Sequence, residues 1–221
     1  MELITGPSPY RMLLDAASTC RRPNSETLPE GDSMFFDTHA HFDLSKGHAP
    51  LEALIGRCRE EGLSRMVAIG GNEKLNDGAV AAAAYGPDWI AVALGYDRDQ
   101  ASALGVESRI EDALSALEQR IENLPAGCRL AALGEMGLDY HYEADTAPQQ
   151  KFLFAAQLSM ARRLGRPVVV HSREADQDTL LMLGAHAQAI QADPQASQAP
   201  GVLHCFTGNW EFAEALVEMG M

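Results

Sequence analysis

From residue 34 onward, short apolar runs alternate with longer segments in which apolar residues recur with a helical period. This alternation constrains the fold more than any other feature, because it is typical of βα units that build a parallel sheet. The runs are continuously apolar, as strands covered on both faces must be. The sequence predicts six strands, at residues 34–39, 65–70, 90–95, 130–134, 167–171 and 202–205.

The segments between the runs are predicted to be helices. Apolar residues within 51–58 have the spacing of one helix face, and residues 110–121 repeat that spacing. Further helices are expected at residues 152–164, 176–192 and 210–219. The predicted fold class is therefore α/β.

The arrangement that suits such units is a TIM-type (β/α)8 barrel, which typically takes about 250 residues. About six of its eight units are expected in residues 34–221, so the barrel domain is expected to be incomplete at its C-terminus. Residues 1–33 contain four prolines and one short apolar cluster, at residues 12–14, and are expected to form a disordered leader.

The chain carries 31 acidic and 17 basic residues, for a formal net charge of −14. This balance argues against a protein that holds nucleic acid on a broad basic surface. Solubility explains an acidic surplus, and so do bound divalent cations, which supply positive charge locally.

No apolar run approaches about 18 residues, so no membrane span is predicted. The four cysteines lie apart, without a Cys-x-x-Cys pair, and the N-terminus lacks a secretory signal pattern. Reduced thiols and a cytoplasmic location are expected.

Potential metal ligands gather at the predicted strand ends. His39 and His41 lie two residues apart near the end of the first strand, where alternate side chains share a face. Alone, such a pair is more typical of a structural hydrogen bond. Glu135, His171 and His204 come at the ends of the fourth, fifth and sixth strands. Because these ends converge in a parallel βα barrel, four imidazoles and a bridging carboxylate predict a metal centre.

Four segments carry a family resemblance: DTHAHFD at 37–43, GEMGLDYH at 134–141, HSREA at 171–175 and HCFTG at 204–208. In this order they resemble the TatD-type metal-dependent deoxyribonucleases, members of the metal-dependent hydrolase superfamily on TIM barrels. The resemblance implies two divalent ions, of Mg, Mn or Zn. It assigns His39 and His41 to the first ion, Glu135 to both ions as the catalytic bridge, and His171 and His204 to the second.

Two departures from the family pattern stand out. Where the family usually has Gly-x-His-Pro after its third strand, this chain has Gly95-Tyr96-Asp97-Arg98. The family's metal-binding Asp follows a seventh strand, which is expected to lie beyond residue 221.

Arg173, Asp139 and His141 are candidate substrate-binding residues. The planar fork of Arg173 suits a phosphate group, although an ion pair with Glu174 is an equal alternative. Asp139 and His141 could also fix the orientation of the metal ligands. His186 is expected on the solvated surface.

The resemblance implies hydrolysis of phosphodiester bonds in DNA, or in another phosphodiester substrate, by water activated between two cations. One alternative is an amide, ester or lactone hydrolase on the same barrel, because the fold does not choose the substrate. A carboxylated bridging lysine would indicate that alternative, but no lysine falls at a predicted strand end. Another is a truncated, catalytically impaired fragment. No stable protein partner is predicted, but open sheet edges favour self-association.

Overall fold

A computed structural model describes residues 35–46, 50–105, 107–196 and 199–221. These residues belong to one unit, Met34–Met221. The leader expected at residues 1–33 lies outside the described residues.

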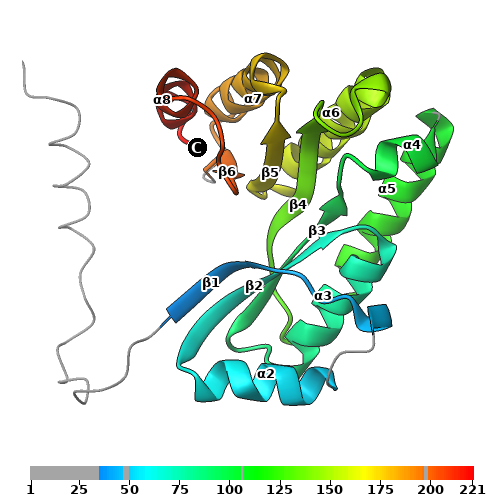
Figure 1. Ribbon diagram of the computed structural model, residues 1–221, viewed down its shortest axis with the longest axis vertical. Coiled ribbons are helices and arrows are strands. Elements are labelled where there is room, and N and C mark those ends of the chain that lie inside the picture. The colour runs from blue at the N-terminus through cyan, green and yellow to red at the C-terminus, as the bar shows by residue number, and fades with distance from the viewer. Residues whose placement is uncertain (1–34, 47–49, 106, 197–198) are drawn as a thin grey trace, which may run out of the picture. The chain divides into compact units, whose positions relative to one another are not determined.

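The unit is built on one sheet of six parallel strands in consecutive order, which curls as part of a barrel (Figure 1). This arrangement confirms the predicted α/β class with about six βα units of a TIM-type fold. The strands are β1 (Phe35–Ala40), β2 (Leu63–Gly71), β3 (Ile90–Tyr96), β4 (Leu130–Asp139), β5 (Val168–Arg173) and β6 (Gly201–Leu203).

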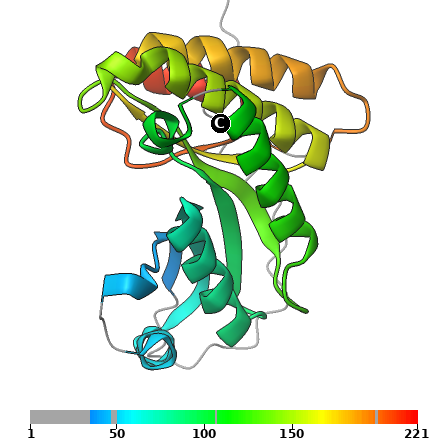
Figure 2. The ribbon, with the colours of Figure 1, turned by 90° about the vertical axis from the view of Figure 1, so that its right-hand side faces the viewer.

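Helices alternate with the strands and lie along the outer side of the curled sheet, where Figure 2 shows several of them in front of the strands. They are α2 (Leu51–Glu60), α3 (Glu73–Tyr85), α4 (Gln100–Leu104), α5 (Glu107–Glu122), α6 (Ala147–Leu164), α7 (Asp176–Gln191) and α8 (Trp210–Glu218). Two short 3-10 helices, η1 (Leu44–Lys46) and η2 (Ala144–Thr146), complete the set. Within the described ranges, no helix is long and apolar enough to cross a membrane.

Both faces of the four central strands, β2 to β5, are largely buried, as the continuously apolar runs predicted, whereas β1 and β6 at the two edges are more exposed. The larger core lies between strands and helices and includes Leu94, Leu133 and Phe154, each 0% exposed. A smaller cluster lies on the inner face and consists of Ile69, Ala93, Ala132 and Val169. Burying one large apolar side chain contributes about 1.5–3 kcal/mol. The two layers therefore fix which side chains of each strand face inward.

A bulge in β4 changes this inward and outward alternation. Leu133 pairs with Val168 and Met136 pairs with Val170, so three steps along β4 match two steps along β5. Leu133 and Met136 both pack in the outer core. The extra residue therefore turns Glu135 to the inner face, the effect bulges commonly have beside functional sites.

The prediction that this strand ends at residue 134 is wrong, because β4 continues to Asp139. Gly134 and Gly137 suggest a strand end in the sequence, but both lie within the strand at positive φ, 135° and 149°. A Cβ atom at Gly134 would lie 2.5 Å from the carbonyl oxygen of Val169. Glycine is thus required at this close approach of the backbones of β4 and β5.

Buried amide side chains from the helices hold the carboxyl ends of β3 and β4. Each donates to the carbonyl and accepts from the N–H of one strand residue. The pairs are Asn76 with Gly95, Gln157 with Tyr96, and Gln150 with Asp139. All three amides are 0% exposed. These bonds position the backbone immediately before the loops that carry the site.

Candidate metal centre

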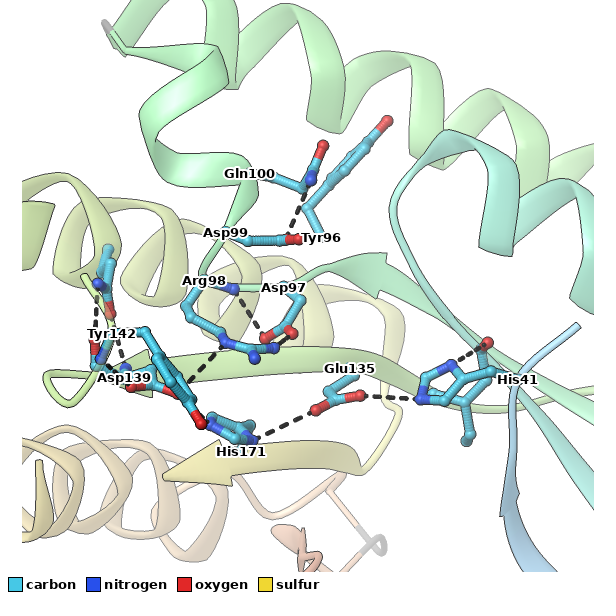
Figure 3. Close-up of polar contacts among 12 residues, drawn as sticks. His41, Tyr96, Asp97, Arg98, Asp99, Gln100, Glu135, Asp139, Tyr142 and His171 are labelled. Atoms are coloured by element: carbon cyan, nitrogen blue, oxygen red, sulfur yellow. Dashed lines mark hydrogen bonds and ion pairs between the residues drawn. The ribbon is translucent and has the colours of Figure 1, made fainter. Parts of the chain in front are cut away.

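The five predicted ligands meet at the carboxyl end of the sheet. They line one cavity of about 500 Å³, and Figure 3 shows Glu135 between His41 and His171. A larger cavity, of about 640 Å³, lies at the opposite strand ends near Leu130 and contains no His, Asp or Glu among its lining residues. The chemistry-bearing side chains therefore gather in the smaller cavity. Its lining ligands are His39, His41, Glu135, His171 and His204.

The local structure of each strand explains this convergence. Ala40 pairs with Ala68 and packs with the outer core, so His39 and His41 on either side of it face inward. Residue 204 lies just beyond β6, which is shorter than the predicted strand at 202–205 because it ends at Leu203. Cys205, at φ 47°, turns the chain away there.

The two carboxylate oxygens of Glu135 face different histidines. Oε2 lies 3.3 Å from Nε2 of His39 and 3.3 Å from Nε2 of His41. Oε1 lies 2.7 Å from Nε2 of His204 and 3.5 Å from Nδ1 of His171. Glu135 is 5% exposed. Its carboxylate divides the four imidazoles into two pairs, one facing each oxygen.

The ring of His41 is oriented by the backbone. Its Nδ1 donates to the carbonyl oxygen of Ile69 at 3.1 Å, which leaves the Nε2 lone pair pointing into the cluster. Nε2 of His39 lies 3.1 Å from that nitrogen. The His39 ring stacks on the ring of His204 with centroids 3.9 Å apart. Three imidazoles are thus packed against one another around Glu135.

His171 is oriented by Asp139. Its Nε2 lies 3.1 Å from Oδ2 of Asp139, a residue that is 0% exposed. A carboxylate on one ring nitrogen leaves the other nitrogen available, an arrangement that metal-binding histidines commonly have. The prediction that Asp139 could orient a ligand agrees with this geometry.

Charge in the cluster follows from these contacts. Burial alone would raise the pKa of Glu135, but hydrogen bonds with His204, His39 and His41 hold the pKa well below its usual range. The hydrogen bond to Glu135 raises the pKa of His41. Burial, followed by the positive charge of Arg98, lowers the pKa of His171. Glu135 is therefore ionised among imidazoles of differing basicity.

These donors fit a divalent cation. One ring nitrogen each of His39 and His204 and one oxygen of Glu135 lie within 4.8 Å of one another. Imidazole nitrogen with carboxylate oxygen is a donor set that Zn²⁺ and similar ions take. The Nε2 atoms of His39 and His41 lie 3.1 Å apart beside a carboxylate, and two ring nitrogens this close need a proton or a cation between them.

None of the three predicted substrate-binding residues is among those that line the cavity. Asp139 instead contacts His171 from beside it. Nδ1 of His141 lies 2.7 Å from Oε1 of Glu174. The guanidinium of Arg173 lies over the ring of Tyr142, 5.0 Å from its centroid. Neither residue contacts the Glu135 cluster within the described part of the chain.

The expectation of a solvated His186 is wrong. His186 is 0% exposed, and its Nδ1 accepts from Nη1 of Arg162 at 3.1 Å. It lies on the same face of α7 as Leu183 and Ile190, which are also buried. That helical spacing is a signal in the sequence that favours burial.

Asp97 and Arg98, next to the metal-ligand cluster, are functional candidates that the sequence did not single out. Both follow β3 and line the cavity. Nη1 of Arg98 binds Oδ2 of Asp97, and its Nε lies 3.7 Å from Oδ2 of Asp139. Their position directly after a strand end is the signal in the sequence that indicates a place in the site. The comparison with Gly-x-His-Pro concerned the histidine that is absent, and not the Asp and Arg that are present.

Comparison with known proteins gives the family context. The profile of the family described as TatD related DNase matches residues 36–221. YabD of Bacillus subtilis (strain 168), described as an uncharacterized metal-dependent hydrolase, is 30% identical over 189 residues, 84% of this chain and 66% of YabD. The 3'-5' ssDNA/RNA exonuclease TatD of Edwardsiella piscicida is 31% identical over 170 residues, 76% of this chain and 58% of that protein.

Among solved structures, the chain is similar to YjjV, a TatD homologue from Escherichia coli K12. The TM-score is 0.65 at 27% sequence identity, over 84% of this chain and 65% of that chain. The chain thus spans 66% of YabD and 65% of the YjjV structure.

Proposed function

Since the chain belongs to the TatD-related DNase family, we propose that it acts as a divalent-metal-dependent hydrolase of phosphodiester bonds in DNA. The observation that carries the proposal is the division of the Glu135 carboxylate between two pairs of histidines. A relative named as a 3'-5' ssDNA/RNA exonuclease supports single-stranded nucleic acid as the substrate class.

The cluster suits two cations that share one carboxylate. His39 and His41 would hold the first ion and His171 and His204 the second, with Glu135 contacting both. Two ions held by these residues would supply Lewis acidity, which lowers the pKa of a bound water and stabilises charge on phosphoryl oxygens. Magnesium, manganese and zinc all remain within this proposal.

The protein's own residues prepare that chemistry. The bond from His41 to Ile69 keeps the Nε2 lone pair of His41 directed at the cluster. Asp139 holds His171 by its Nε2, so the Nδ1 lone pair faces Glu135. The low pKa of Glu135 keeps both of its oxygens available at neutral pH.

The experiment is hydrolysis of a labelled single-stranded oligonucleotide by the chain loaded in turn with Mg²⁺, Mn²⁺ and Zn²⁺. Shortened products are expected with at least one ion and none after chelation. Glu135→Gln should abolish them, because it removes the charge shared by both ions. A metal-loaded protein that cleaves no oligonucleotide would refute the proposal.

The alternative is an amide, ester or lactone hydrolase. The excess of 31 acidic over 17 basic residues favours this alternative, and the same assay distinguishes it from a nuclease. Hydrolysis of a carboxylic ester or lactone without cleavage of DNA would support that alternative. We also propose a cytoplasmic location, which the free thiols of Cys58, Cys128 and Cys205 support.

A further inference from the structure

A single permanent positive charge lies in the metal-ligand cavity. Of the described residues that line it, Arg98 is the only Arg or Lys. Figure 3 shows its guanidinium between Asp97 and the row formed by Glu135 and His171. In a chain of net charge −14, with Asp97, Asp99 and Glu135 also in the cavity wall, Arg98 is the described lining group that suits an anion when no cation is bound.

The backbone that carries Arg98 is rigidly held. Gln157 binds both the N–H and the carbonyl of Tyr96, at 2.8 and 2.7 Å. The N–H of Asp97 donates to the carbonyl of Gly71 at 2.8 Å. The N–H of Arg98 itself donates to Oδ1 of Asp97 at 2.7 Å. The start of this loop is therefore fixed to α6 and β2.

The side chain is held on two sides as well. Asp97 binds Nη1, and Asp139 lies 3.7 Å from Nε. The side chain is 25% exposed and lines the cavity, so part of the guanidinium is open to a ligand there. A guanidinium held in this way keeps N–H donors in a fixed plane for a ligand, at little further cost in side-chain entropy.

The charge of Arg98 reaches the metal-ligand cluster. It contributes to lowering the pKa of His171, after burial, and it opposes the rise in the pKa of His41. These two histidines belong to the two different pairs around Glu135. Arg98 thus acts electrostatically on one histidine of each pair.

We propose that Arg98 is the residue that binds the phosphate oxygens of the substrate, and that Asp97 is its positioning residue. This inference rests on the proposed function, which supplies a phosphodiester as substrate. The shared chemistry is a phosphate group, carried by nucleic acid or by a small phosphorylated molecule. Two other groups, His141 and Arg173, face Glu174 and Tyr142 instead of the cavity.

The test is calorimetric binding of two probes to the metal-loaded chain: inorganic phosphate and a single-stranded phosphorothioate oligonucleotide. Arg98→Met should weaken binding by about tenfold or more, because it removes charge-assisted hydrogen bonds. Metal content is measured in every variant, so that a lost ion is not mistaken for a lost anion contact. Arg163→Met is the matched control, because Arg163 is also paired with a carboxylate, that of Glu118, at an exposed site.

Weaker binding of both probes supports Arg98 and identifies nucleic acid as the source of the phosphate. Weaker binding of inorganic phosphate alone supports Arg98 with a small phosphorylated substrate. Unchanged binding of both probes, or a loss with Arg173→Met instead, overturns the inference. If Arg98→Met fails to fold, Arg98→Lys serves, because its ammonium lacks the planar fork; wild-type affinity in that variant also overturns it.

These outcomes are separate from those of the proposed function. If the chain binds phosphate through Arg98 but hydrolyses no phosphodiester, the anion site is supported and the nuclease function is refuted. If the chain is a nuclease but its Arg98→Met variant binds both probes normally, the function is supported and the role of Arg98 is refuted. Side-chain positioning by Asp97 is tested by Asp97→Glu, which keeps the charge and should raise KM for the oligonucleotide more than it lowers kcat.

Discussion

Oε1 of Glu135 lies 2.7 Å from Nε2 of His204, although 69 residues separate the two in the chain. The other oxygen of the same carboxylate lies 3.3 Å from His41. One buried charge therefore joins β4 to the ends of β1 and β6, the first and last strands of the sheet. Its replacement is expected to disturb every part of the cluster at once.

Glu135→Gln should lower metal affinity by more than about 100-fold, since even residues that only support a ligand contribute 10–100-fold. The amide keeps the size of the side chain but not its charge. Metal bound per chain after dialysis, measured by atomic emission, checks this expectation. Glu118→Gln removes a half-buried carboxylate that pairs with Arg163 outside the cavity and should keep wild-type metal content. Equal metal content in the two variants would contradict a bridging role for Glu135.

His186 should make the protein less stable in acid. Burial, followed by the charge of Arg162, lowers the pKa of this imidazole in the folded chain. Below about pH 6.5 the unfolded chain takes up a proton first. The free energy of unfolding therefore falls as pH decreases from about 6.5 toward the folded-state pKa. Above about pH 6.5 His186 is neutral in both states and causes no pH dependence.

Urea unfolding of the wild type and of His186→Gln, from neutral pH to mild acid, measures that slope. The variant should be less stable than the wild type near neutral pH, because it disturbs a buried contact. Its loss of stability on acidification should nevertheless be smaller. Parallel curves for the two proteins would show that His186 is not the group responsible.

Gln157→Leu should destabilise the fold by about 1–3 kcal/mol, because it leaves the N–H and carbonyl of Tyr96 buried without partners. It should also weaken phosphate binding, since Tyr96 precedes the loop that carries Arg98. Chemical unfolding and phosphate titration are the measurements. Gln188→Leu, at an exposed position of the next helix, should change neither. Wild-type stability in Gln157→Leu would contradict the role assigned to this amide.

The first and last strands of the described sheet have open edges, and we expect the chain to self-associate through them. Phe36 on β1 is 60% exposed and Val202 on β6 is 55% exposed. Sedimentation velocity should show a concentration-dependent species larger than a monomer. Phe36→Lys should reduce it, because a charged edge opposes strand pairing, whereas Tyr85→Lys on α3 should not. A monomer at every concentration would exclude this association.

The order of the strands and the convergence of the five candidate ligands on one cavity were predictable because they depend on local patterns. Continuous apolar runs identify buried parallel strands, and ligands at their ends converge whatever the details of packing. His171 and His204 were placed correctly in this way, within a residue or two of the strand ends.

The remaining features depend on contacts between distant parts of the chain. The burial of His186 needs Arg162 of α6, and the position of Arg98 needs Asp139 of β4. The bulge in β4 needs the close approach of Val169, which makes Gly134 necessary. A glycine in a sequence indicates a turn as readily as a bulge, so the strand end was predicted too early.

Because of that bulge, the alternation of inward-facing and outward-facing side chains shifts by one residue along β4. Before it the odd-numbered Leu133 faces the helices, and after it the odd-numbered Glu135 faces the metal-ligand cavity. If β4 continued the alternation set by Leu133 without a bulge, Glu135 would face the helices instead of the cavity. The direction of the bridging carboxylate therefore depends on where the bulge lies as well as on which residue follows Gly134: a bulge placed after Met136 would leave the same ligands in the sequence and no carboxylate in the cavity.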